Sequence, residues 1–376
     1  MRRIAFDARY VNDRYHGIGR YAFRLVEALA VMASEHHFIV FRGRGSDSRF
    51  HWQGLAALPN VELREGPWPL YGPHEQFLWP LLLRQAQADL FHSPYIVAPL
   101  FAPCPVVITV HDLIFDRYPA YMPSAWARPY YRLLMTWGTR RARRIIAVSR
   151  ATAADLTRIY RMPPEKITVI PEGVDPHFSQ PVDGDQLRSL SRRYHLPRPF
   201  ILTVGVRRPH KNLARLVEAF AAIAPETAHD LVFVGPADPR FPDEALQAVA
   251  RHQLNGRVHF LGWVPEADLP GLYALATVVV LPSVIEGFGL PALEAMACGT
   301  PVLVADASAL PEVVGEAGMR VDPYDVAALA EAMRKLLRDG DLRRRLGQAG
   351  RQRAAMFTWQ EAARQLLQVY DDLLLA

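Results

Sequence analysis

The chain has 376 residues, a length that is too great for one ordinary domain and suits two. Half of the residues are hydrophobic and 22% are charged, which is the composition of a globular protein. The net charge of +5 is only mildly basic and is weak evidence for any particular partner. The two cysteines, Cys104 and Cys298, lie far apart, which argues against a disulfide framework and favours free thiols in a reducing compartment.

The N-terminus predicts a first strand and no signal peptide, because its apolar stretch ends at Asp7. No apolar run reaches the ~18 residues that a membrane-spanning helix needs. We therefore expect a soluble cytoplasmic protein, and peripheral contact with the inner face of the membrane stays open.

Short apolar runs alternate with amphipathic stretches along the whole chain. The strands predicted in the first half are Arg3–Phe6, Phe38–Phe41, Asp89–His92, Val106–Val110, Ile145–Val148 and Thr168–Ile170. Those in the second half are Phe200–Val204, Leu231–Val234, Val258–Phe260, Val278–Leu281, Val302–Val304 and Met319–Val321. This alternation predicts an α/β protein with two doubly wound, Rossmann-like parallel sheets and helices on both faces of each.

The strand series breaks between about Phe178 and Arg198, where the composition of Gln180 to Asp185 is typical of a linker. We place the N-terminal domain at residues 1–180 and the C-terminal domain at 195–358, with a cleft between them. Ligands of such sheets bind beyond the carboxyl ends of the strands.

Two stretches of the first half follow predicted strands and carry candidate site residues. Gly17 and Gly19 open an early helix near the end of the first strand and favour a site facing the cleft, although such a pair is often only a flexible turn. His111 and Asp112 emerge at the end of a later strand, where a His–carboxylate pair can orient a substrate or move a proton. The alternative for this pair is a structural contact at the sheet edge. Glu172, after the last strand of this half, is interpreted as part of a plain turn.

The segment from Tyr118 to Arg144 is rich in aromatic residues, including Trp126, and ends in a cluster of arginines. Such a pattern can rest at a membrane interface or hold a lipid-diphosphate acceptor. Stacking on single-stranded nucleic acid is a further interpretation, but we expect no nucleic-acid partner. The interpretation we favour is an amphipathic helix with snorkelling arginines.

In the second half, a strand runs into Gly205, then a basic loop with Arg207, Arg208 and Lys211, and then a helix that Asn212 is expected to cap. A diphosphate there would gain charge-assisted hydrogen bonds and the favourable end of the helix dipole. The alternative is a solvated basic turn. Further on, Trp263 could hold a nucleotide base or pack in the core.

The most informative stretch runs from Glu286 to Glu294, two carboxylates eight positions apart with two glycines and Pro291 between them. The glycines allow backbone N–H groups to approach a ligand, and Pro291 suits the first turn of a helix whose N-terminus can face a phosphate. Backbone amides for a phosphate and carboxylates for hydroxyl groups together predict a site for a nucleotide-sugar.

Two Asp-x-Asp sequences, Asp183 to Asp185 and Asp339 to Asp341, match a pattern of metal-dependent sugar transferases. Neither follows an apolar strand, and both are interpreted as turns. We expect no metal site.

Taken together, these stretches resemble family 4 glycosyltransferases, which share the two-domain GT-B fold and retain the anomeric configuration of the sugar. The landmarks are His16 to Tyr21, His111 to Leu113, Val148-Ser149 with Asp155-Leu156, Pro171 to Asp175, and the highly specific run from Leu281 to Val302.

The resemblance implies a role for each matching residue. Glu286 would contact the hydroxyls of the donor sugar, Glu294 the ribose, and Lys211 the phosphates. His111 would lie near the reacting centre. The implied catalytic residues are His111, Glu286, Lys211 and Arg207. The implied nucleotide-sugar site comprises Gly17, Gly19, Gly205, Arg207, Arg208, Lys211, Gly235, Trp263, Val264, Glu286, Gly287, Phe288, Gly289, Leu290 and Glu294. The final helix, at 359–376, would pack back on the N-terminal domain.

Two positions depart from the family pattern. Val206 stands where many relatives carry the clamping arginine, so Arg207 or Arg208 must substitute for it. Glu172 stands where relatives often have asparagine, and its charge disfavours direct contact with an anion.

The resemblance implies a retaining hexosyltransferase that needs no metal or other cofactor and uses a nucleoside-diphosphate sugar as donor. GDP-mannose is the first choice, as in bacterial mannosyl- and rhamnosyltransferases of surface-polysaccharide synthesis, while UDP-glucose, UDP-N-acetylglucosamine, GDP-fucose and dTDP-rhamnose stay open. The acceptor would be a saccharide or a polyprenyl-linked saccharide. The alternatives are a nucleotide-sugar epimerase or phosphorylase of the same fold, or a non-catalytic nucleotide or sugar binder.

Overall fold

The computed structural model describes residues 1–11, 16–43, 50–66, 70, 72, 74–122, 127–196 and 199–375. Trp126 and Arg198, both used in the sequence interpretation, lie outside these residues. The chain forms two compact units, residues 1–173 with 358–376 and residues 174–357. Both cysteines are free thiols, as predicted. Among the described residues, no helix has the length and apolar character needed to cross a membrane.

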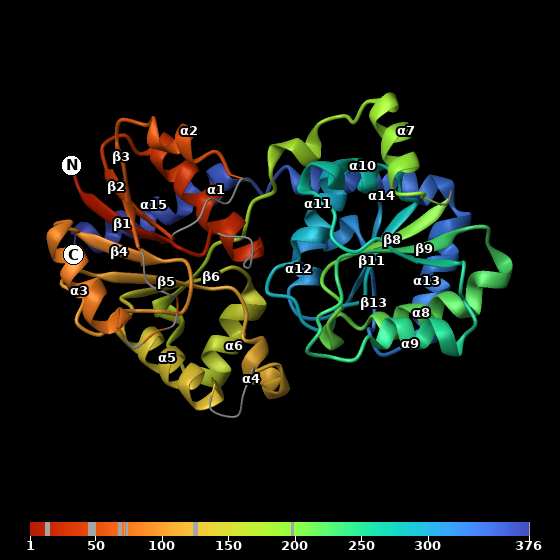
Figure 1. Cartoon of the computed structure of the whole chain (residues 1–376), viewed down its shortest axis with the longest axis horizontal. Helices are drawn as coiled ribbons and strands as arrows, with labels where there is room; N and C mark the ends of the chain where they lie inside the picture. The colour runs from red at the N-terminus through yellow and green to blue at the C-terminus, as the bar shows by residue number, and fades with distance from the viewer. Residues whose placement is uncertain are drawn as a thin grey trace. The chain divides into compact units, whose positions relative to one another are not determined.

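Unit 1 is a seven-stranded sheet in the order β3-β2-β1-β4-β5-β6-β7, with every neighbouring pair parallel and helices on both faces (Figure 1). Its strands are β1 (Arg3–Ala8), β2 (His37–Arg42), β3 (Val61–Glu65), β4 (Leu90–Ser93), β5 (Val106–Val110), β6 (Arg144–Ala147) and β7 (Ile167–Val169). Its helices are α1 (His16–Met32), α2 (Trp52–Ala56), α3 (Glu75–Gln85), α4 (Ile114–Arg117), α5 (Ala127–Arg141), α6 (Arg150–Tyr160) and α15 (Trp359–Leu375).

Unit 2 is a six-stranded parallel sheet in the order β10-β9-β8-β11-β12-β13. Its strands are β8 (Phe200–Val204), β9 (Asp230–Val234), β10 (Val258–Phe260), β11 (Val278–Leu281), β12 (Val302–Ala305) and β13 (Met319–Val321). Its helices are α7 (Gly184–Arg193), α8 (Leu213–Ile223), α9 (Glu244–Arg251), α10 (Leu269–Leu275), α11 (Leu290–Cys298), α12 (Leu310–Val314), α13 (Val326–Arg338) and α14 (Gly340–Ala354).

Central strands such as β5 and β11 are nearly continuous apolar runs because helices cover both faces of each sheet. All five residues of β5, Val-Val-Ile-Thr-Val, are buried, and so are all four of β11. Every strand predicted from the sequence is present, which confirms the two doubly wound sheets. The prediction missed β3, an edge strand whose charged residues alternate with Val61 and Leu63.

Residues 174–194 belong to unit 2, and they comprise the last residues of the predicted N-terminal domain, up to 180, and the predicted linker from Gln180 to Asp185 with the residues after it. They include α7, whose N-terminus is capped by the Asp183 carboxylate, which accepts from the backbone N–H of Asp185 and Gln186. Leu190 of α7 lies against Gly271 of α10, where a Cβ atom would come within 2.2 Å of the leucine side chain. A helix therefore begins at Gly184, inside the predicted linker, because packing on α10 stabilises it.

The last helix, α15, packs against α1 within unit 1 (Figure 1). Trp359 contacts the ring of Tyr21 edge-on, with the ring centroids 6.0 Å apart. Tyr370 is fully buried and its hydroxyl is hydrogen-bonded to Nδ1 of His92. The C-terminus of the chain thus completes the core of the N-terminal unit.

Candidate functional site

The order of strands reverses between β8 and β11 in unit 2, and the carboxyl ends of these two strands form a small pocket with the residues that follow them. Its lining comprises Thr203, Val204, Gly205, Lys211, Leu213, Leu281, Pro282 and Ser283. A reversal of this kind is the usual ligand site of an open α/β sheet, because the loops there diverge to opposite faces. The sequence places both of its strongest candidate stretches at this point.

Glycine is required where the chain leaves β8 and β9. Gly205 has φ of +146° and Gly235 has φ of +124°, a backbone region that other residues rarely adopt. A Cβ atom on Gly235 would lie 2.2 Å from the carbonyl oxygen of Gly205. Both predicted glycines therefore allow these two backbones to approach closely at the edge of the pocket.

Lys211 and Glu286, predicted separately, are in contact. The Lys211 ammonium donates a hydrogen bond of 2.6 Å to Oε1 of Glu286, and both side chains are largely buried. The loop of Lys211 is fixed by Asn212, which has φ of +58° and donates through Nδ2 to the carbonyls of Pro282 and Pro323. The Asn212 side chain makes no capping hydrogen bond with α8, so the predicted capping role was wrong.

The two arginines of the basic loop differ in their surroundings. Arg207 donates to the Asp243 carboxylate and to the carbonyl of Gly235, and its guanidinium lies 4.6 Å from the centroid of the Phe260 ring. Its side chain is only 13% exposed, whereas that of Arg208 is 38% exposed and donates to Asp238. Arg207 is thus held against the body of unit 2, and Arg208 is the more accessible cation.

The second glutamate lies inside α11. Glu294 is buried, and its Oε2 accepts a hydrogen bond of 2.8 Å from the Tyr273 hydroxyl of α10. Gly289 precedes α11 with φ of +113°, where a Cβ atom would lie 2.7 Å from the Leu310 side chain. The loop from Gly287 to Gly289 therefore turns tightly into Leu290, the first residue of α11, as the glycines in the sequence predict.

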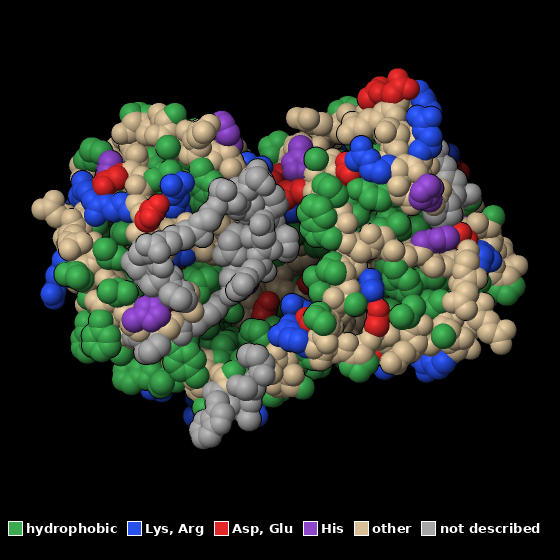
Figure 2. All heavy atoms as spheres, in the orientation of Figure 1, with side chains coloured by type: hydrophobic (Ala, Val, Ile, Leu, Met, Phe, Trp, Pro, Cys, Tyr) green, Lys and Arg blue, Asp and Glu red, His purple; other side chains and the backbone are tan. Residues whose placement is uncertain are grey.

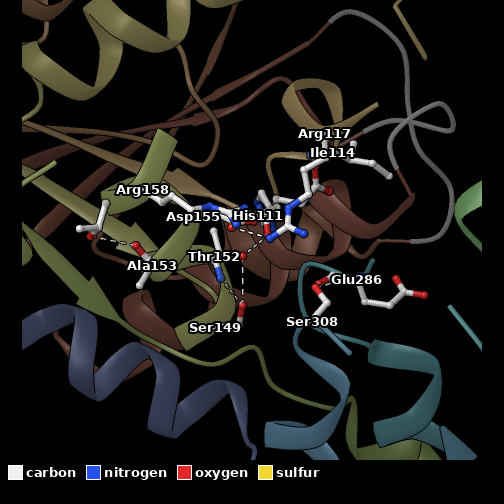
Figure 3. Close-up of polar contacts among 12 residues, drawn as sticks. His111, Ile114, Arg117, Ser149, Thr152, Ala153, Asp155, Arg158, Glu286 and Ser308 are labelled. Carbon is white, nitrogen blue, oxygen red and sulfur yellow. Dashed lines mark hydrogen bonds and ion pairs between the residues drawn. The ribbon is translucent and has the colours of Figure 1, made fainter. Parts of the chain in front are cut away.

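Other residues on the loops around this site have different roles. Phe288 is buried with its ring 5.9 Å from that of Phe357. The Ser308 hydroxyl donates to the backbone carbonyl of Glu286 (Figure 3). This bond fixes the main chain and leaves the Glu286 carboxylate to Lys211. Trp263 is 60% exposed on the loop after β10, and the adjacent Val264 is buried. The core alternative for Trp263 was therefore wrong.

In unit 1, His111 follows β5 and is 8% exposed. Its Nδ1 is 3.0 Å from the Glu172 carboxylate and its Nε2 is 3.0 Å from the carbonyl oxygen of Pro94. Glu172 therefore contacts His111 directly, a partnership that the sequence interpretation, a plain turn, did not foresee.

The main chain of His111 is also held. Its carbonyl accepts from the Thr152 hydroxyl, and Thr152 in turn accepts from the hydroxyl of Ser149, the N-cap residue of α6 (Figure 3). Tyr21 of α1 meets the His111 ring edge-on at 4.7 Å between centroids. Gly17 and Gly19 lie in the first turn of α1, which leaves backbone N–H groups there without intrahelical partners, while the side chain of His16 lies outside the described residues.

A buried ionic cluster at the end of β1 was missed by the sequence interpretation. Arg9 donates from Nε and Nη2 to both carboxylate oxygens of Asp7, each at 2.8 Å, and also pairs with Glu75 of α3. All three are at most 3% exposed. The Asp-x-Arg spacing after a strand is the local signal that was available, while Glu75, 66 positions from Arg9, gives no such signal.

The two Asp-x-Asp sequences cap helices. Asp183 caps α7, and the Asp339 carboxylate accepts from the backbone N–H of Leu342 at the start of α14. Asp341 pairs with Arg344 on the same helix. Both sequences were interpreted as turns, and each instead has its first aspartate at a helix N-cap and its second in the first turn of that helix.

The comparisons agree with this geometry. Residues 15–178 match the family model described as Glycosyltransferase Family 4, and residues 192–353 match the one described as Glycosyl transferases group 1. The chain is 30% identical to O-antigen chain mannosyltransferase B of Escherichia coli, over 99% of this chain and 100% of that protein. It is 35% identical to MMP alpha-(1->4)-mannosyltransferase of Mycolicibacterium hassiacum, over 71% of this chain and 65% of that one.

Among solved structures, sucrose-phosphate synthase from Thermosynechococcus elongatus superposes with a TM-score of 0.76 at 25% identity, covering 99% of both chains. Two parallel sheets in the order found here are the two halves of the GT-B fold. The chain therefore belongs to the family 4 glycosyltransferases, enzymes with the GT-B fold.

Proposed function

We propose that this glycosyltransferase moves a hexose, with mannose as first choice, from a nucleoside-diphosphate sugar to a saccharide or lipid-linked saccharide, with retention of the anomeric configuration. The observation that carries the proposal is the contact between Lys211 and Glu286 beside the pocket where β8 and β11 diverge. A cation for the diphosphate and a carboxylate for sugar hydroxyls lie next to each other there.

The proposed reaction breaks the bond between the anomeric carbon and the diphosphate. Negative charge then grows on the leaving phosphate, and Lys211, Arg208 and the backbone amides of the first turn of α11 would stabilise it. Preorganised cations and amides of this kind can do so without a divalent ion. Retention fits attack by the acceptor hydroxyl on the face that the departing phosphate leaves, with that phosphate taking the proton.

The remaining parts of the proposal rest on particular residues. Buried Glu294 would bind the ribose, and exposed Trp263 would cover the base. Unit 1 would receive the acceptor near His111. The mannosyl choice is supported by the two relatives, one named for O-antigen chains and the other for an alpha-(1->4) linkage. Such an acceptor would place the enzyme in the cytoplasm, at the inner face of the membrane.

A thermal-shift panel of GDP, UDP, dTDP and ADP tests the donor. A nucleotide at a hundredfold excess over its dissociation constant stabilises by about 2.7 kcal/mol, so the preferred base should stand out as a raised melting temperature. We expect GDP to give the largest shift and GDP-mannose to be consumed when a mannoside acceptor is present. A preference for another base would refute the mannosyl choice but not the transferase.

Two rival functions predict different outcomes. An epimerase would convert the donor when no acceptor is present, which nuclear magnetic resonance of the donor incubated alone would detect. A non-catalytic binder would show nucleotide-stabilised melting and no turnover with any acceptor. We expect neither result.

A further inference from the structure

Unit 2 contains another cavity, here called the Phe178 pocket, with a volume of about 390 Å³. It shares no lining residue with the pocket at the ends of β8 and β11. One wall is the stretch from Phe178 to Val182, and the others come from α10, α11 and α14. Helix α11 packs against both α10 and α14 (Figure 1). A cavity of this size can hold a small organic molecule.

Most of the lining of this pocket is apolar. The apolar residues are Phe178, Pro181, Val182, Pro270, Ala274 and Ala297. Phe178, Pro270 and Ala297 are buried, so the packing of unit 2 sets this part of the wall before any ligand binds. A preformed apolar wall accepts the apolar body of a ligand, and a few polar groups then fix its orientation.

Three polar side chains on the lining have hydrogen-bonding capacity that the described residues do not use. Ser179 and Gln180 make no side-chain hydrogen bond within the part of the chain that the structure describes. Arg351 donates from Nη2 to the carbonyl oxygen of Cys298, at 3.0 Å, and pairs with no carboxylate among the described residues. A guanidinium has five N–H donors, so most of those of Arg351 are left to water or a ligand.

The position of Arg351 is set by the glycine that follows α11. Gly299 has φ of +80°, and a Cβ atom there would lie 2.3 Å from Nε of Arg351. The guanidinium therefore lies directly against the main chain of Gly299, where any other residue would displace it. This contact places the cation at the pocket before a ligand arrives.

No acidic residue is among the described residues that line the pocket. The nearby helix α7 carries two aspartates, but Asp183 caps the helix and Asp185 pairs with Arg188. Figure 2 shows acidic and basic side chains next to each other over α7, at the top of the view. The pocket thus offers a cation without a competing anion. A carboxylate fits this cation best, because its two oxygens match the fork of a guanidinium.

The Phe178 pocket is connected to Glu294 by two sets of contacts. The ring of Phe178 lies 6.0 Å from that of Tyr273, between centroids, and the Tyr273 hydroxyl donates to Glu294. Ala297 and Cys298 also lie one turn beyond Glu294 on α11. A ligand in the pocket would therefore restrict both the ring that contacts Tyr273 and the helix that carries Glu294.

We propose that the Phe178 pocket binds a small organic acid with a flat apolar body, and that its occupation strengthens nucleotide binding. The carboxylate would meet Arg351, and the apolar body would lie on Phe178 and Pro270. A ligand that orders these elements lowers the ordering cost that remains when a nucleotide binds at Glu294. The binding of the acid stands on the pocket alone, whereas its effect on the nucleotide rests on the proposed function.

Thiol footprinting of the full chain locates the ligand, because Cys298 lines the pocket while Cys104 is buried in unit 1. The probe is 1-naphthoate, and 1-naphthamide is its neutral counterpart. At a tenfold excess over its dissociation constant, 1-naphthoate should slow the alkylation of Cys298 by iodoacetamide by about tenfold. The alkylation of Cys104 should not change. Mass spectrometry of the two cysteine peptides gives both rates.

Isothermal titration of 1-naphthoate into variants tests the assigned contacts. Arg351→Gln should weaken binding by about tenfold or more and remove the preference over 1-naphthamide, because a charged hydrogen bond is lost. The matched control is Arg345→Gln, at an exposed position six residues earlier on α14, which should bind like the unchanged protein. Ala274→Phe fills the pocket from an exposed position of α10, so it should abolish binding without lowering the melting temperature.

The effect on the nucleotide is measured with the nucleoside diphosphate that gives the largest thermal shift. Saturating 1-naphthoate should tighten its binding by about fivefold. Tyr273→Phe should still bind 1-naphthoate but lose most of this gain, because it lacks the hydroxyl that donates to Glu294.

Unprotected Cys298, or equal affinity for the acid and the amide, would overturn the site. Protection of Cys298 with unchanged nucleotide affinity would overturn the coupling. If no nucleotide binds at all, the proposed function fails and the coupling fails with it, whereas footprinting still decides whether the pocket binds the acid.

Discussion

The ammonium of Lys211 lies 2.6 Å from a carboxylate oxygen of Glu286, although the two residues are 75 positions apart. One follows β8 and the other follows β11, so the reversal of strand order in the sheet is what brings them together. Each side chain is more than four-fifths buried, and each would leave the other as an uncompensated charge if it were removed. The pair therefore orients a cation toward the pocket before any ligand is bound.

Replacing Lys211 by alanine should slow transfer by roughly a hundredfold, the usual loss when one preorganised charge contact to a transition state is removed. Steady-state kinetics with a nucleoside-diphosphate sugar would measure it. The control is Lys335→Ala, an exposed lysine on α13.

A second variant separates charge stabilisation from the positioning of Glu286. If Lys211 acts only by holding Glu286, then Glu286→Gln and the double variant should both match Lys211→Ala in rate. We expect the double variant to be slower than either single one. Unchanged kinetics in Lys211→Ala would refute the assignment.

The two neighbouring arginines should respond differently to substitution. Arg207→Ala removes charged hydrogen bonds to Asp243 and a stacking contact on Phe260, so unit 2 should lose roughly 2 kcal/mol of unfolding free energy. Arg208→Ala, at the more exposed position, should keep the melting temperature and lower the turnover number by about tenfold. Calorimetry and kinetics on both proteins would measure these effects. The reverse pattern would assign Arg207 to the diphosphate.

These arginines mark what the sequence could and could not predict. The spacing of glycine, basic loop and helix predicts where a diphosphate site begins, because a strand, a turn and a helix start are local features. The choice between Arg207 and Arg208 depends on Asp243 and Phe260, which are 36 and more positions away, and no local pattern reports them. Asn212 is a similar case, since it occupies a helix-cap position while its side chain binds Pro282 and Pro323.

Edge and surface elements were the weak points of the fold prediction. The buried strands are mainly apolar and were all found. Strand β3 alternates apolar and charged residues, a pattern that indicates a strand with one face toward solvent. The Asp183-Gly184-Asp185 sequence was interpreted as a turn, but its first aspartate is a helix cap. The helix that it caps is stabilised because leucines of α7 pack against α10, and that contact is distant in sequence.

Glu294→Gln should weaken nucleoside-diphosphate binding by about tenfold to a hundredfold, because a neutral amide replaces a charged acceptor for the ribose hydroxyls. Isothermal titration with GDP would measure the dissociation constant. Tyr273→Phe is the companion variant, since it keeps the carboxylate and removes the hydroxyl that donates to it. Equal affinity in Glu294→Gln and the unchanged protein would show that the ribose lies elsewhere.

Removal of divalent cations should leave transfer unchanged. The proposed stabilisation of the leaving phosphate comes from Lys211, Arg208 and helix amides, none of which a chelator affects. Initial rates with and without EDTA, in metal-depleted buffer, give the comparison. A complete loss that Mg²⁺ restores would assign the charge stabilisation to a metal ion.

Two buried histidines predict that acid destabilises the fold below neutral pH. Burial, reinforced by Lys211 and Arg208, lowers the pKa of His210 to about 2. Burial next to His111 lowers the pKa of His92 to about 3. Histidine in an unfolded chain has a pKa of about 6.5, so between these values the unfolded chain binds more protons than the folded one. Stability must then rise with pH across this window, and the full contribution is present only above about pH 6.5.

Acidification to about pH 5 should cost about 2 kcal/mol of unfolding free energy for each of these histidines. Urea unfolding of the full chain at a series of pH values would measure the slope. His210→Gln should be less stable at neutral pH but flatter in its pH dependence by one proton, whereas His252→Gln, at an exposed position, should keep the original slope. A slope unchanged by His210→Gln would mean that His210 takes up its proton in the folded protein, and the loop that carries Lys211 would then have to open in mild acid.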